Sequence, residues 1–149
     1  MAATIPLLYA LPRFAWHLGV PLGVSEEFLA TLGDASVAGL GLGLFAVVGS
    51  LLTLGLVMPW GETFWSWVPV VGGRPVPVSL AVVPALFVST AVMTAGVGFV
   101  RMAVGGDLAD VPGATTDWAT WAPTLLWPAW AAALAVAALA YRARRADPA

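Results

Sequence analysis

The chain has 149 residues, of which 60% are hydrophobic and only 9% are charged, and its formal net charge at pH 7 is −2. An average soluble domain carries about 25% charged residues and could not bury so much apolar surface at this size, so a water-soluble fold is excluded and the lipid bilayer is the expected partner. The net charge is small and no basic patch is present, which excludes nucleic acid as a partner. The chain has a single His and no Cys, so no set of residues has the spacing of a metal site, and no metal or cofactor is expected.

Residues 4–20 are apolar enough for a membrane helix, yet they contain Arg13 and His17. On a helix these two residues, four positions apart, share one face with Tyr9 and Trp16. Such a helix either forms a short span whose Arg13 side chain extends to the surface or lies flat at the interface. Arg13 and His17 are accordingly either interfacial anchors or a proton or substrate site, because an ionisable group in a membrane is costly unless it is paired or hydrated.

Residues 35–58 carry no charge and exceed the length of about 20 residues that crosses a bilayer of roughly 30 Å. Small residues follow one face of this first span, namely Gly39, Gly43, Ala46 and Ser50. A face of this kind lets another helix approach closely. It is therefore either a contact between copies of the chain or a packing surface within the chain.

Residues 58–77, MPWGETFWSWVPVVGGRPVP, are rich in Trp, Pro and Gly and predict a surface loop between two spans. Tryptophan is typical of the membrane–water interface, where the ring is buried and the N–H stays hydrated. The interfacial tryptophans expected on these grounds are Trp60, Trp65 and Trp67 at this boundary and Trp118 and Trp121 at another. Within the loop, a salt bridge between Glu62 and Arg74 is plausible and is expected to contribute only about 0–1 kcal/mol.

Residues 76–100 and 122–141 are the second and third uncharged spans. Hydrocarbon leaves no water for backbone groups, so only helices or closed barrels cross it, and the absence of two-residue alternation favours helices. Pro84 and Pro128 fall inside these spans and are predicted to kink them. The chain is thus predicted to be one all-α integral membrane helical bundle over residues 1–149, with three spans and a short N-terminal fourth helix.

The distribution of charge between the spans predicts the orientation. Asp107, Asp110 and Asp117 do not have the spacing of a calcium loop and are interpreted as a solvated acidic loop. That loop carries one Arg, whereas the carboxy-terminal tail carries three and the Trp-rich loop carries Arg74. The positive-inside rule then places the tail and the Trp-rich loop on the cytoplasmic side of the cytoplasmic (inner) membrane.

Three stretches of the chain resemble one group of membrane proteins: YALPRFAWHLGVPLGVSEEF, PWGETFWSWVPVVGGRPVPVSLAVVPA and LLWPAWAAALAVAALAYRARR. They are similar to the later part of multi-span membrane proteins common in actinobacteria, which are uncharacterised. The motifs that carry this resemblance are a Trp-Gly-Glu turn, a Gly-Gly-Arg-Pro turn and a closing Trp-Pro-x-Trp helix with an Arg tail. The resemblance implies helices and a cytoplasmic Trp-rich loop, and it transfers no catalytic residue.

Two functions are consistent with these features. No constellation of residues has catalytic spacing, which favours a non-enzymatic membrane component that self-associates or packs as an accessory subunit against a larger partner. The alternative is a small transporter or channel subunit, in which Arg13, His17 and kinks at Pro84 and Pro128 line a path. A membrane enzyme is not expected, because neither a nucleophile nor a metal accompanies the few ionisable groups.

Overall fold

The computed structural model describes residues 2–107, 113 and 116–146 of the chain, and their secondary structure is helical apart from an isolated β-bridge. In chain order the helices are α1 (Thr4–His17), α2 (Glu26–Leu32), α3 (Ala35–Val57), the 3-10 helix η1 (Pro59–Glu62), α4 (Val78–Gly105), the 3-10 helices η2 (Trp118–Thr120) and η3 (Ala122–Leu126), and α5 (Trp127–Ala146). Three helical segments, Ala35–Val57, Val78–Gly105 and Ala122–Ala146, are long and apolar enough to cross a membrane. The predicted all-α bundle with three spans is thereby confirmed.

The spans differ from their predicted bounds mainly at the ends. α4 continues past Arg101 and ends where Gly106 adopts a φ of 89°, a left-handed conformation that glycine accepts easily. A long Arg side chain near a helix end can extend to the surface, so Arg101 does not mark the end of the helix. Pro84 lies inside α4 as predicted. Pro128 also lies inside its span, Ala122–Ala146, as predicted. It is the second residue of α5, directly after the 3-10 helix η3, and proline is tolerated in the first turn of an α-helix.

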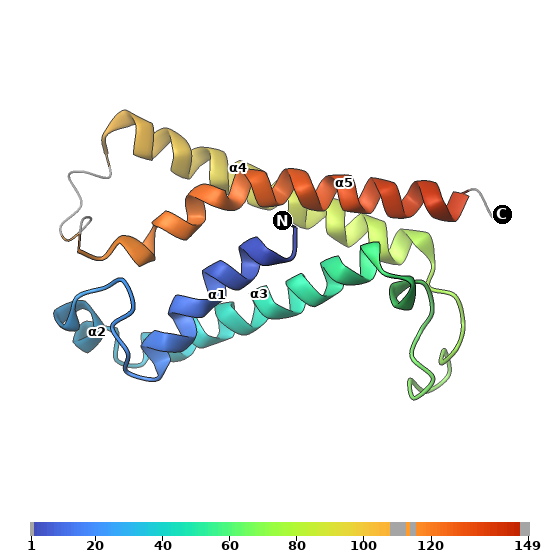
Figure 1. Cartoon of the computed structure of the whole chain (residues 1–149), viewed down its shortest axis with the longest axis horizontal. Coiled ribbons are helices and arrows are strands. Elements are labelled where there is room, and N and C mark those ends of the chain that lie inside the picture. The colour runs from blue at the N-terminus through green and yellow to red at the C-terminus, as the bar shows by residue number, and fades with distance from the viewer. Residues whose placement is uncertain (1, 108–112, 114–115, 147–149) are drawn as a thin grey trace.

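Helix α1 lies along α3 and runs antiparallel to it. Near one end of the pair, a Cβ atom on Gly43 would come 3.4 Å from Cβ of Arg13. Near the other end, the Ser50 hydroxyl donates to the backbone carbonyl of Ala3. The 14 residues of α1 extend over about 21 Å, less than the roughly 30 Å of a hydrocarbon core. α1 is therefore neither a full span nor a helix lying across the ends of the others, and it begins near the middle of the molecule (Figure 1).

The bundle consists of two helix pairs, α1 with α3 and α4 with α5 (Figure 1). In the second pair, Gly96 of α4 allows a very close approach, because a Cβ atom there would lie 2.7 Å from Cδ of Pro128 and 2.8 Å from Cβ of Trp127. The Ser89 hydroxyl of α4 donates to the carbonyl of Ala131 in α5 at 2.8 Å. Such small-residue contacts and interhelical hydrogen bonds hold helices together where lipid removes the hydrophobic driving force.

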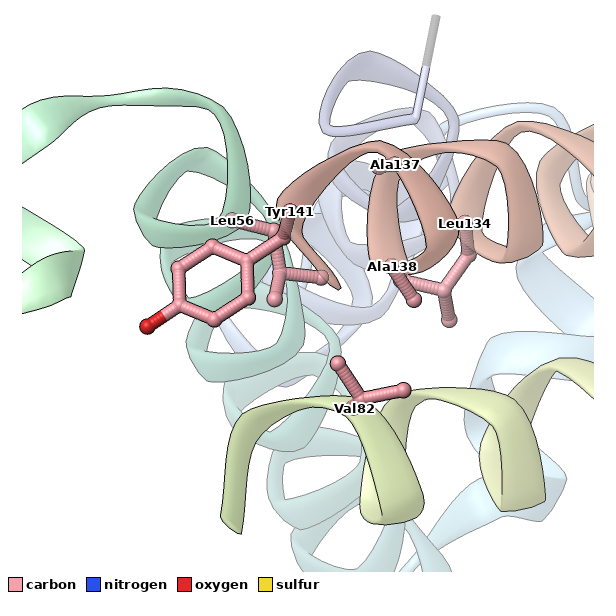
Figure 2. Close-up of a cluster of buried hydrophobic side chains, with 6 residues drawn as sticks. All are labelled: Leu56, Val82, Leu134, Ala137, Ala138 and Tyr141. Carbon is pink, nitrogen blue, oxygen red and sulfur yellow. The ribbon is translucent and has the colours of Figure 1, made fainter. Parts of the chain in front are cut away.

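The two pairs meet in a buried cluster near the carboxy-terminal end of α5. Leu56 from α3 and Val82 from α4 pack there against four residues of α5, which are Leu134, Ala137, Ala138 and Tyr141 (Figure 2). Tyr141 and Ala138 are 0% exposed. The alanines keep α5 narrow at this crossing, which lets α3 and α4 both reach it.

The opposite end of the bundle is closed by the segment around α2. Ser25 caps α2 by accepting a hydrogen bond from the Phe28 N–H at 3.1 Å. The Ser25 N–H in turn donates to Oδ1 of Asp117 at 2.6 Å, and the Ala119 N–H donates to the Gly23 carbonyl at 3.0 Å. The interpretation of Asp117 as a merely solvated acid is therefore wrong: its carboxylate ties two distant segments together. Asp107 is exposed, and Asp110 lies outside the described residues.

Candidate functional site

The Trp-rich loop (residues 58–77) folds back on itself as a short hairpin. Thr63 and Pro75 form an antiparallel bridge. Next to it, the Phe64 N–H donates to the Arg74 carbonyl at 2.9 Å. The segment predicted as a surface loop therefore has a paired backbone where Thr63 meets Pro75.

The tryptophans of this loop form a row at its surface. The ring centroids of Trp60 and Trp65 lie 6.1 Å apart, and those of Trp65 and Trp67 lie 5.6 Å apart. All three rings are exposed, Trp67 to 72%. Trp118 is exposed at the opposite end of the bundle, and Trp121 is partly buried there. The two groups thus lie at the two ends of the spanning helices, where interfacial tryptophans are expected.

The last turns of α5 hold the Trp-rich loop and the end of α3. The Tyr141 hydroxyl donates to the Gly61 carbonyl at 3.3 Å. The Arg144 Nη2 atom donates to the Leu56 carbonyl at 2.6 Å, in the last turn of α3. Carbonyls in this turn have no partner within their own helix, and a cation stabilises them. The arginine tail, which was read for orientation alone, therefore also has a structural role.

Glu62 pairs with an arginine other than the one expected. Its Oε2 atom lies 3.7 Å from Nη1 of Arg145, whereas Arg74 is exposed and contributes its backbone carbonyl to the hairpin. The suggested bridge between Glu62 and Arg74 is not formed among the described residues. The last turn of α5 lies directly against the loop, and Arg145 therefore reaches the carboxylate.

An apolar groove of about 660 Å³ lies between α3 and α4 beneath the Trp-rich loop. It is lined by Val48, Gly49, Leu51, Leu52, Thr53, Gly55 and Leu56 of α3, by Leu80, Ala81, Pro84, Ala85 and Val88 of α4, by Trp130 and Leu134 of α5, and by Trp60, Gly61, Thr63, Phe64, Trp65, Trp67, Val68 and Val76 of the segment between α3 and α4. None of these side chains is charged. The hydroxyl of Thr53 donates to the Gly49 carbonyl within α3 at 2.7 Å, so this hydroxyl has a partner without any ligand.

A close glycine contact brings the Trp-rich loop over the groove. A Cβ atom on Gly61 would overlap the backbone of Gly55, and a Cβ atom on Gly55 would lie 3.2 Å from the ring of Trp60. Only residues without side chains allow the loop backbone to lie on the end of α3 in this way. The groove is therefore covered at this end by aromatic rings.

Arg13 and His17 lie away from this groove. The guanidinium carbon of Arg13 is 5.0 Å from the ring centroid of Tyr9 and 4.5 Å from that of Trp16. Aromatic faces stabilise a cation by about 0.5–2 kcal/mol, so these rings act as partners of the partly buried charge. His17 is exposed at the end of α1, and the structure brings neither residue near Glu62, which lies at the opposite end of the bundle.

The small-residue face of α3 is occupied by α1. Gly43, Ala46 and Ser50 are buried and Gly39 is partly buried. A Cβ atom on Gly43 would come 3.5 Å from the Phe14 ring as well as close to Arg13. The sequence left two alternatives for this face, a contact between copies of the chain and packing within the chain. The structure shows packing within the chain, against α1.

Sequence reasoning did not find the groove or the partners of the arginine tail. The segments involved are 20 to 90 positions apart, and no local pattern connects them. One signal was present: Gly55 and Gly61 flank the first turn of the Trp-rich loop, and closely spaced glycines at a helix end indicate a close backbone approach.

Within the described ranges, no group of three or more His, Asp or Glu side chains could hold a metal ion. In comparisons with known proteins, no family model matches the chain, and neither a curated protein nor a solved structure matches it. The apolar groove and the uncovered helix faces are therefore the features from which a function can be argued.

Proposed function

We propose that this chain is a non-enzymatic component of the cytoplasmic membrane, an accessory subunit that packs within the bilayer against a larger membrane protein or against a second copy of itself. The observation that supports this proposal is the uncovered surface of α4. In the most apolar window of α4, 17% of the residues are buried inside the chain, compared with 33% for α3. Lipid or another protein covers the rest.

One face of α4 suits a second helix. Thr90, Thr94 and Gly98 follow each other at intervals of four, and all three are exposed. A Cβ atom on Gly98 would meet nothing within 4 Å. The hydroxyls of Thr90 and Thr94 donate to carbonyls of their own helix at 2.9 and 3.0 Å, so they need no partner from elsewhere. Small residues at this spacing let two helices approach closely, which is how helices associate in lipid.

The alternative of a transporter or channel subunit has less support from the geometry. A path for ions or polar solutes is lined by charges or by carbonyl and hydroxyl groups. The groove is apolar, and the Arg13 charge lies against Tyr9 and Trp16 outside it. No observation favours this function over an accessory role.

The proposal includes an orientation in which the Trp-rich loop and the carboxy terminus are cytoplasmic. The contact between Arg145 and Glu62 supports placing the carboxy-terminal tail and the Trp-rich loop at the same end of the molecule. The arginines of both segments are therefore counted on one side of the membrane when the positive-inside rule is applied. Kinship with the multi-span actinobacterial proteins stays a prediction from the quoted motifs.

Photo-crosslinking in living cells of the native host tests the association. A photoreactive amino acid is placed at Thr94, and the control position is Phe45, which is 73% exposed on α3. We expect Thr94 to give a protein adduct that is absent at Phe45. An adduct whose mass exceeds that of the single chain by 15.4 kDa identifies a second copy. A larger increase in mass identifies a larger partner. If Thr94 gives no protein adduct beyond the control, the accessory function is wrong.

A further inference from the structure

We infer that the groove between α3 and α4 is a binding site for one acyl chain of a membrane phospholipid, which enters sideways from the leaflet next to the Trp-rich loop. The edges of the groove lie on the outer surface of the bundle. Val48 and Leu52 on α3 and Leu80 on α4 line it and are 51%, 66% and 57% exposed. The groove therefore opens between two spanning helices, where hydrocarbon chains are the surrounding medium.

The depth of the groove matches one leaflet. Along α3 it extends from Val48 to Leu56, which at 1.5 Å per residue is about 12 Å. One leaflet contributes about 15 Å of the roughly 30 Å hydrocarbon core. A single acyl chain occupies one leaflet, so this depth suits it.

The volume of the groove, about 660 Å³, suits a single acyl chain. Ligand pockets for single small molecules typically measure about 300–1,000 Å³ and are mostly apolar.

The lining is almost entirely apolar, and its one buried polar side-chain atom without a hydrogen-bond partner among the described residues is Nε1 of Trp130. No lining side chain is charged, and the hydroxyl of Thr53, on the wall, is hydrogen-bonded within its own helix. Trp65 and Trp67 belong to the Trp-rich loop and line the end of the groove that this loop covers. Indole rings at a membrane boundary lie at the level of the lipid headgroups. A phospholipid with its headgroup at this level would have its acyl chain directed into the groove.

Two glycines of α3 provide a matched pair of variants. A Cβ atom on Gly49 or on Gly41 would meet nothing within 4 Å, but only Gly49 lines the groove. Gly49→Leu therefore fills the groove without a clash at its Cβ atom, and Gly41→Leu adds the same side chain to an exposed surface elsewhere on α3. Leu80→Trp narrows the groove from α4, and Phe87→Trp is its control, because Phe87 is 74% exposed and does not line the groove.

The experiment uses the full chain in phosphatidylethanolamine vesicles doped with a phosphatidylethanolamine that carries a photoreactive group on its acyl chain. After irradiation, mass spectrometry locates the lipid adducts, and circular dichroism verifies that each variant is folded. We expect adducts concentrated on the groove-lining residues of α3 and α4, reduced about tenfold by Gly49→Leu and by Leu80→Trp and unchanged by the two controls.

Two outcomes overturn the inference. Adducts spread evenly over the exposed faces, including Phe45 and Phe87, would show ordinary lipid contact. Groove adducts that persist in the folded Gly49→Leu and Leu80→Trp variants would show that the acyl chain is not bound inside the groove. Either result leaves the proposed association through α4 untouched, because that proposal is tested by protein adducts at Thr94.

Discussion

Arg145 contacts Glu62 across 83 positions of the sequence, with its Nη1 atom 3.7 Å from Oε2 of the carboxylate. The same guanidinium donates to the Glu62 carbonyl at 3.4 Å and to the Val76 carbonyl at 3.1 Å. One side chain at the end of α5 therefore holds both strands of the Trp-rich hairpin. Since this hairpin covers the groove, the carboxy-terminal helix determines the shape of a site formed mainly by α3 and α4.

Replacing this arginine should loosen the loop. We expect Arg145→Ala to lower the free energy of unfolding by about 1–2 kcal/mol, since it removes an ion pair and two charge-assisted hydrogen bonds that are partly exposed. Thermal unfolding in lipid nanodiscs measures the loss, and hydrogen exchange should rise in residues 62–76. Arg142→Ala is the control, because Arg142 is exposed on the same helix; equal effects of the two variants would contradict the role of Arg145.

The contact between α4 and α5 should not tolerate a side chain at Gly96. We expect Gly96→Ala to destabilise the bundle by about 1–3 kcal/mol, because its methyl group would overlap Pro128 and Trp127 and force the helices apart. Gly98→Ala, two residues further along, meets no atoms within 4 Å and should be neutral or stabilising, by up to about 1 kcal/mol, because alanine favours helix. Melting temperatures in detergent give both values, and a Gly96 variant as stable as the Gly98 variant would rule out the close contact.

The position of α1 predicts an unusual pattern of accessibility. A single Cys at Ala3 should resist a membrane-impermeant maleimide in intact cells and also in opened cells, because this residue lies beside Ser50 within the bundle. The chain contains no other Cys to interfere. Labelling of Ala3→Cys from outside intact cells would instead mean that α1 lies on the outer surface, and labelling only after cells are opened would mean that it spans.

The same assay tests the orientation. Ser66 in the Trp-rich loop and Thr116 at the opposite end are both exposed, so a Cys at either position is open to the reagent from its own side. We expect Thr116→Cys to react in intact cells and Ser66→Cys to react only after the cells are opened. The reverse pattern would invert the proposed orientation.

Asp117 should stabilise the end of the bundle near α2. Asp117→Ala removes the carboxylate that accepts the Ser25 N–H at 2.6 Å, and we expect a loss of about 1–2 kcal/mol with faster exchange of that amide. Asp107→Ala changes an exposed acid and should have little effect on either measurement. Unchanged exchange at Ser25 in the Asp117 variant would contradict this role.

The length and position of the three spans could be read from the sequence, because a run of about 20 uncharged residues is a local property that the bilayer itself selects. The first span was located to within a residue, 35–58 against Ala35–Val57. The Trp-rich boundaries were found for the same reason, since indole rings prefer the interface whatever the tertiary structure is.

What the sequence left open was decided by contacts between distant segments. The small-residue face of α3 is equally suited to a second copy and to α1, and only the folded chain shows α1 beside Gly43 and Ser50. Glu62 was matched with the nearest arginine in the sequence, Arg74, whereas packing presents Arg145.

The sequence by itself thus determined a membrane-spanning, all-helical chain with aromatic boundaries, because the length, apolarity and composition of each segment are properties of that segment alone. The tertiary structure decided which helix faces are covered, which charges are paired and where the groove lies. The physical reason is that lipid solvates every apolar helix face almost equally well, so hydropathy does not distinguish a packed face from a free one. Close fit between particular side chains makes that choice, as it does where Gly96 meets Pro128.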